Sequence, residues 1–263
     1  MKKYIALTLI FLFSFFLFGC GVPKKEKELN DLEVVKKRGY LIVGVKEDSP
    51  PFGFRNKEGK LIGMDIDIAY EIARNIFNSN SFANVKFVVV NPQNRISKLN
   101  SKEVDVLVAT MSVNEKRKLI LEFSMPYFVA RQKLMMLKTT KINNLQYFNK
   151  DGRLAIVMGT TGERVARLFA PSANLVGAKN YQEALDLLMN YKVDAILGDD
   201  CILAGYKNKN LKILNHAYSN EFYAVAIRKT RKSQELLNAV NSAIAQTLDE
   251  RKLNLITKKW IAY

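Results

Sequence analysis

The chain has 263 residues, of which 48% are hydrophobic and 25% are charged. This composition excludes a largely disordered protein, and the length suits two modest lobes or one large domain. Lysine and arginine outnumber aspartate and glutamate by 41 to 25, which is a formal charge of +16. Because the lysines are dispersed rather than gathered into one arm, we expect a solvated basic surface and no nucleic acid partner.

The N-terminus has the pattern of a secretion signal. Two lysines precede an apolar run over residues 4–18 that is too short for a comfortable membrane span. The run ends in Leu-Phe-Gly-Cys at 17–20, which resembles a lipobox, a cleavage site whose cysteine carries a lipid. We therefore predict a signal peptide over 1–19, a lipid on Cys20, and a flexible polar tether over 20–30. The alternative is a plain signal anchor. The predicted location is the periplasm or the outer face of the cell membrane.

Strand-like and helix-like segments alternate over the first half of the chain. A compact apolar run at 40–45 predicts a strand that is buried on both faces. Residues 63–77 carry isoleucine at every fourth position from Ile68, which predicts an amphipathic helix. Three further elements follow: a strand at 85–90, a short helix at 96–99 and a strand at 104–109. This order predicts an open, largely parallel sheet.

A second set of the same kind occupies the later part of the chain. Its predicted elements are a strand at 153–158, a helix at 162–169, a short strand at 175–176, a helix at 181–191 and a strand at 195–197. Residues 233–263 have the spacing of a long helical tail. Two similar α/β units in one chain predict two lobes rather than one continuous sheet.

Polar residues follow three of these strands at the point where each strand ends. In open α/β sheets, ligands bind beyond the carboxyl ends of the strands, where backbone N–H groups point outwards. The residues at these ends are Thr110, Ser112 and Arg117 in the first lobe, and Gly159, Thr160, Thr161 and Asp199 in the second. A guanidinium binds a carboxylate through two hydrogen bonds, and a carboxylate accepts from an ammonium. Together these residue types predict a site for an amino acid zwitterion.

Several short motifs occur in one order along the chain. They are Leu-Ile-Val-Gly-Val (41–45), Pro-Pro-Phe (50–52), Gly-Met-Asp-Ile-Asp (63–67), Lys-Glu-Val-Asp-Val (102–106), Glu-Lys-Arg (115–117), Phe-Ser-Met-Pro-Tyr (123–127), Gly-Thr-Thr (159–161) and Val-Asp-Ala-Ile (193–196). Through them, residues 41–260 resemble the periplasmic polar amino acid-binding proteins of ABC transporters, solute-binding family 3. Within this family the chain is most similar to the cysteine/cystine-binding lipoproteins.

The resemblance implies an α/β fold of the type II two-lobe clamp. Lobe 1 would comprise residues 29–128 and 223–263, and lobe 2 would comprise residues 129–222. The implied partners are a free amino acid, with cysteine favoured, a transporter permease, and the membrane through the lipid on Cys20. The implied protein is a monomer without catalytic residues, cofactor or metal.

The resemblance also implies roles for single residues. Arg117 would grip the ligand carboxylate with help from the Ser112 amide and the Thr161 backbone, and Asp199 would take the ammonium together with Thr110. Phe52 would form an apolar wall, and Tyr127 would lie on the hinge side. Asn114 stands where the family usually has threonine, and either side chain can cap the following helix.

Two alternatives remain open. Arg95 lies in Gln-Asn-Arg-Ile at 93–96, a string similar to one in glutamate/aspartate-binding members, where the arginine helps to read a side-chain carboxylate. An acidic amino acid therefore competes with cysteine as the ligand. The same architecture also occurs in prephenate and arogenate dehydratases, which need a proton donor or acceptor. His216, the one histidine, lies in a predicted loop away from the strand ends, so we expect a binding protein rather than an enzyme.

Overall fold

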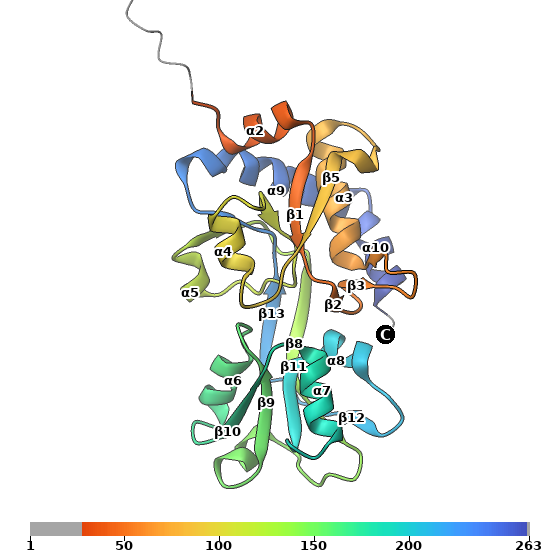
Figure 1. Cartoon of the computed structure of the whole chain (residues 1–263), viewed down its shortest axis with the longest axis vertical. Helices are drawn as coiled ribbons and strands as arrows, with labels where there is room; N and C mark the ends of the chain where they lie inside the picture. The colour runs from red at the N-terminus through yellow and green to blue at the C-terminus, as the bar shows by residue number, and fades with distance from the viewer. Residues whose placement is uncertain (1–27, 262–263) are drawn as a thin grey trace, which may run out of the picture.

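The computed structural model describes residues 28–261, so the predicted signal peptide and Cys20 lie outside the described part. Figure 1 shows two lobes one above the other along the long axis, joined by strands β8 (Phe128–Leu137) and β13 (Ser219–Tyr223), which run side by side between them. Each lobe has its own sheet with helices packed on it, as the sequence predicts. Among residues 28–261, no helix is long and apolar enough to cross a membrane.

The upper lobe, lobe 1, is built on a five-stranded sheet. Its strand order is β5 (Val85–Val89), β1 (Leu41–Val45), β6 (Val106–Leu107), β14 (Ala226–Arg228) and β7 (Leu121–Phe123). β1 runs parallel to both of its neighbours, whereas β14 runs antiparallel to β6 and β7. The chain therefore leaves lobe 1 through β8 and returns through β13 to complete the first sheet with β14. The predicted strand at 104–109 pairs only over Val106–Leu107.

Helix α3 (Met64–Phe77) covers the lobe 1 sheet with the face that its isoleucine spacing predicts. Ile68, Ile72 and Ile76 are all buried. The helix packs against α9 (Gln234–Asp249) and α10 (Lys252–Trp260). These two replace the single helical tail predicted from the sequence, because the chain adopts left-handed backbone at Arg251 and turns α10 back onto α3. The remaining helical segments of lobe 1 are α2 (Asp31–Arg38), η1 (Phe82–Asn84), α4 (Arg95–Asn100), α5 (Glu115–Lys118) and η3 (Arg231–Ser233).

The lower lobe, lobe 2, has a six-stranded sheet. The order is β10 (Asn174–Ala178), β9 (Arg153–Val157), β11 (Ala195–Asp199), β8 and β12 (Leu211–Ile213), with β13 also paired to β8. β9, β10 and β11 are parallel, and β8 is antiparallel to β11. The helical segments are η2 (Leu145–Asn149), α6 (Gly162–Phe169), α7 (Tyr181–Met189) and α8 (Asp200–Tyr206). The carboxyl ends of β9 and β11 point up towards lobe 1 (Figure 1).

A small three-stranded antiparallel sheet extends lobe 1 beside the gap between the lobes. It contains β2 (Asp48–Ser49), β3 (Gly53–Arg55) and β4 (Leu61–Ile62), none of which the sequence patterns predicted. These strands are too short to show a period-2 alternation. β2 follows β1 closely, so the segment between Lys46 and Pro51 is held near the carboxyl end of that strand.

Candidate ligand-binding site

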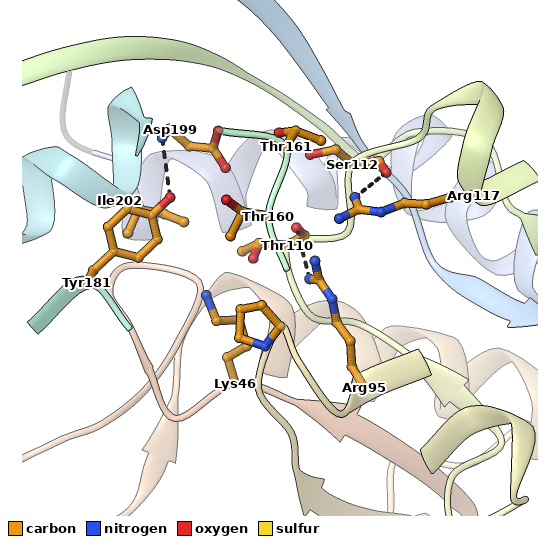
Figure 2. Close-up of a pocket in the computed structure, with 11 residues that line it drawn as sticks. Lys46, Arg95, Thr110, Ser112, Arg117, Thr160, Thr161, Tyr181, Asp199 and Ile202 are labelled. Atoms are coloured by element: carbon orange, nitrogen blue, oxygen red, sulfur yellow. Dashed lines mark hydrogen bonds between the residues drawn. The ribbon is translucent and has the colours of Figure 1, made fainter. Parts of the chain in front are cut away.

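One pocket lies between the two lobes, at the edge where the strand ends of both sheets meet. Seven of its lining residues are among those predicted from the sequence: Arg95, Thr110, Ser112, Arg117, Thr160, Thr161 and Asp199. Four others line it as well: Lys46, Pro92, Tyr181 and Ile202. Figure 2 shows Lys46 and the two arginines entering from lobe 1 and Tyr181 and Asp199 from lobe 2. The cavity they leave has a volume of about 10 Å³, which is room for about one water molecule.

Arg117 is held by its own loop and by the opposite lobe. The Asn114 side chain accepts a hydrogen bond from the Arg117 amide at 2.9 Å, which caps α5 as expected. The guanidinium then donates through Nη1 to the Ser112 carbonyl (2.7 Å) and through Nη2 to the Gly159 carbonyl of lobe 2 (3.1 Å). Burial lowers the pKa of Arg117, whose exposed fraction is 9%. The guanidinium is therefore oriented and poorly hydrated, as a carboxylate receptor requires.

Arg95 brings a second guanidinium to the same pocket. It begins α4, it is 2% exposed, and its Nη1 donates to the Ala109 carbonyl at 2.7 Å. Its Nη2 lies 3.4 Å from the Gly159 carbonyl, and its buried Nε has no hydrogen-bond partner in the described part of the chain. Burial first, and then the positive charge of Arg117, lower the pKa of Arg95 to about 9.

Lys46 is a third buried cation, which is not among the site residues predicted from the sequence. It directly follows β1 and is 2% exposed, with its amine 5.5 Å from the centre of the Tyr181 ring. Burial lowers its pKa to about 8. The rule that located the other residues, polar side chains just past a strand end, applies to Lys46 equally well.

Asp199 is the one carboxylate among the residues that line the pocket. It ends β11 and is held by a hydrogen bond from Gln132 Nε2 to its Oδ1 (2.6 Å) and by another from the Tyr223 hydroxyl to its Oδ2. Burial, followed by the nearby Glu221 carboxylate, raises its pKa to about 6. Gln132 and Tyr223 lie on β8 and β13, so the acceptor is fixed to the two connecting strands.

Three predicted site residues lie outside this lining. Phe52 is fully buried in an aromatic cluster, with ring centres 5.1 Å from Phe128 and 5.2 Å from Tyr223. Tyr127 is also buried, and its hydroxyl donates to Asp65 at 2.8 Å. Gly159 contributes its carbonyl to the two arginines rather than a wall of the pocket. The strand-end rule does not cover Phe52 and Tyr127, which the family resemblance alone had suggested.

The histidine and cysteine side chains that could serve in catalysis do not line the pocket. His216 is exposed between β12 and β13 and packs against Tyr218, with ring centres 4.7 Å apart. Cys201 is a free, half-buried thiol whose pKa burial raises to about 12, which suppresses the reactive thiolate. Among residues 28–261, no cluster of histidine, cysteine or carboxylate side chains could hold a metal ion.

The family model of the bacterial extracellular solute-binding proteins, family 3, matches residues 41–263. The chain belongs to this family. The match covers both lobes and every residue that lines the pocket. The motif resemblance found in the sequence is thereby confirmed.

Individual relatives of this family 3 protein differ in what their names say they bind. The chain is 32% identical to the ABC transporter glutamine-binding protein GlnH of Bacillus subtilis over 99% of its own length and 98% of the relative's. It is 35% identical to the glutamine-binding protein of Geobacillus stearothermophilus, covering 88% and 94% of the two chains. Among solved structures, the cysteine-binding protein of Campylobacter jejuni superposes with a TM-score of 0.82 at 25% identity, covering 88% and 93%.

Proposed function

We propose that this protein captures an acidic amino acid, glutamate or aspartate, for an ABC importer. The observation that carries the proposal is the charge of the pocket: Lys46, Arg95 and Arg117 line it, whereas Asp199 is the only carboxylate that does. Burying more cations than anions is costly, so an anionic ligand is favoured at such a lining. These four side chains carry a formal charge of +2 (3 − 1). A ligand with two carboxylates and one ammonium lowers this charge to +1, whereas a neutral zwitterion leaves it at +2.

Each ligand group has a matching position in the pocket. Arg117 is oriented by its hydrogen bond to the Ser112 carbonyl and lines the pocket together with Thr161, and it would take the α-carboxylate. Asp199 is held by Gln132 and Tyr223 and would take the α-ammonium. Lys46 and Arg95 would then share the side-chain carboxylate. The Nε of Arg95 has no hydrogen-bond partner in the described part of the chain, so it could donate to this side-chain carboxylate.

The three relatives described above have two neutral ligands in their names, glutamine and cysteine. The motif resemblance in the sequence also favours cysteine. The protein's own carboxylates near Lys46 and Arg95 are those of Asp48, Asp65 and Asp199. A neutral zwitterion would pair with Arg117 and Asp199 but would bring no side-chain carboxylate to Lys46 and Arg95. For this reason we place the acidic amino acids ahead of cysteine, which the sequence alone preferred.

A thermal-shift screen tests the ligand assignment. We expect L-glutamate or L-aspartate at 1 mM to raise the melting temperature by about 10 °C if Kd is about 1 μM, since a thousandfold excess over Kd adds about 4 kcal/mol. L-Glutamine, L-cysteine and L-cystine should give smaller shifts. The protein should first be refolded to remove carried-over ligand. A large shift with glutamine or cysteine and none with glutamate would contradict the acidic assignment.

The position of His216 counts against the dehydratase alternative. His216, the residue that could supply an imidazole, is exposed and does not line the pocket. The relatives named above are binding proteins. We therefore propose a binding protein without catalytic activity, and adding prephenate to the screen checks this directly.

Anchoring by lipid is the part of the proposal that concerns the N-terminus. We expect Cys20 to carry lipid and the mature protein to enter the detergent phase on phase separation. Growth with a tagged fatty acid, comparing the wild type with Cys20→Ala, measures this, and Cys201→Ala is the matched control that should keep the label. Equal labelling of the wild type and Cys20→Ala would rule out this anchor.

A further inference from the structure

The two lobes touch on both flanks of the pocket through residues outside the groups proposed to bind the ligand. On the first flank, Gln93 lies just before α4 in lobe 1. Its Nε2 donates to the carbonyl oxygens of Met158 (2.7 Å) and Lys179 (3.1 Å), which follow β9 and β10 in lobe 2. One exposed amide thus bridges the lobes with two hydrogen bonds.

The second flank joins α8 of lobe 2 to the β2 segment of lobe 1. The hydroxyl of Tyr206, the last residue of α8, donates to the Asp48 carbonyl. The Tyr206 ring stacks on Tyr181 of the pocket, with ring centres 6.2 Å apart and planes at 28°. Each of the two interlobe contacts adjoins the pocket, since Gln93 follows the lining residue Pro92 and Tyr206 stacks on Tyr181. Both contacts use backbone carbonyl groups as acceptors.

A glycine stands at each of these contacts. A Cβ on Gly159 would lie 2.6 Å from the Pro92 carbonyl oxygen, and a Cβ on Gly205 would lie 2.6 Å from the Pro50 carbonyl oxygen. Gly159 also has a φ of +77°, so its backbone alone favours glycine. Gly205 does not have a left-handed φ, and glycine in a helix is unfavourable relative to alanine. All three nearest atoms to its added Cβ belong to Pro50, so the approach of lobe 1 is what excludes a side chain there.

We propose that these two flanking contacts, Gln93 with Met158 and Lys179, and Gly205–Tyr206 with Asp48 and Pro50, form a closure seam that sets ligand affinity from outside the pocket. This inference rests on the proposed function as a clamp. Arg117 and Asp199 belong to different lobes, so tight binding needs the closed arrangement. The measured Kd equals the intrinsic Kd divided by the fraction of molecules able to close. Residues that stabilise closure therefore tighten binding without touching the ligand.

Two seam variants and two matched controls test the inference. Gly205→Ala adds one methyl group against Pro50, and Gln93→Ala removes both amide hydrogen bonds. Ala204→Ser adds one atom at the exposed neighbour on α8, and Gln182→Ala removes a hydrogen bond to Asp186 within α7 of lobe 2. The binding of L-glutamate is measured by calorimetry, and the melting temperature and the radius of gyration without ligand are measured for every protein.

We expect each seam variant to weaken L-glutamate binding about tenfold, since a lost hydrogen bond or a backbone clash acts only in the closed form. Both controls should stay within about twofold of wild type. Gly205→Ala should melt no lower than the wild type without ligand, because alanine is the better helix former. It should also enlarge the radius of gyration, as the lobes are held further apart.

The outcomes separate the seam from the proposed ligand. If the wild type binds L-glutamate and both seam variants bind within twofold of it, the seam inference is overturned. If the wild type does not bind L-glutamate but Gly205→Ala enlarges the radius of gyration, the acidic ligand assignment fails and the seam stands. If the wild type does not bind L-glutamate, the ligand with the largest shift in the thermal screen replaces it, and seam variants that bind that ligand within twofold of the wild type overturn the seam inference.

Discussion

Replacing Arg117 by alanine is expected to abolish useful binding of the ligand. Truncating one partner of a buried, hydrogen-bonded charge pair costs about 2–5 kcal/mol, which is a rise in Kd of about 30- to 4,000-fold. The loss is large because Asp199 binds the opposite end of the ligand and cannot take over its α-carboxylate. Calorimetry with the best ligand from the screen measures the change.

Two further variants show whether the effect of Arg117→Ala comes from the loss of the guanidinium at this position. Arg117→Lys keeps the charge but loses the planar pair of donors, so its Kd should lie between those of alanine and wild type. Arg231→Ala removes an exposed arginine from η3 of lobe 1 and should leave Kd unchanged. An Arg117→Ala protein that stays folded and binds within twofold of wild type would remove Arg117 from the site.

Replacing Lys46 by methionine is expected to change the specificity of the pocket rather than destroy it. Methionine fills a similar volume without the charge, so a side-chain carboxylate loses one of its two proposed cations. We expect the Kd of glutamate to rise about 100-fold, because its buried side-chain carboxylate loses a cationic partner. The Kd of glutamine should change less than about threefold, because its side-chain amide carries no charge. Calorimetry with both ligands gives the ratio, and Lys57→Met, at an exposed position in lobe 1, is the control.

The same lysine predicts a pH dependence of glutamate affinity. Burial lowers the Lys46 pKa to about 8, and the charged groups around its amine are those of Asp48, Arg95, Asp199 and Asp65. Only the protonated amine can pair with the ligand carboxylate. Glutamate affinity should therefore fall as the pH rises above 8, by up to about tenfold per unit. Glutamine, whose ammonium titrates in a similar way, gives the reference. Parallel pH profiles for the two ligands in the wild type would exclude Lys46 as a reader of the side-chain carboxylate.

Local patterns in the sequence were sufficient to predict those helices and strands whose buried residues recur at a short, regular spacing. The isoleucine spacing of α3 and the apolar run of β1 are local properties of the chain, and both elements form close to the predicted residues. Asn114 caps α5 for the same reason, since a helix cap involves only its neighbours. Most of the pocket also followed from local information, because the carboxyl ends of parallel strands must meet at one edge of a sheet.

Long-range packing decided the rest. Lys46 could have been placed by the strand-end rule, but its burial against Tyr181 depends on a helix 135 residues further along the chain, 181 − 46. Asp199 is oriented by Gln132 and Tyr223, which come from the two strands that join the lobes. Nothing within a few residues of Gly205 indicates that Pro50 approaches it. Such contacts depend on how the two lobes pack against each other, and the spacing of residues along the chain does not predict that packing.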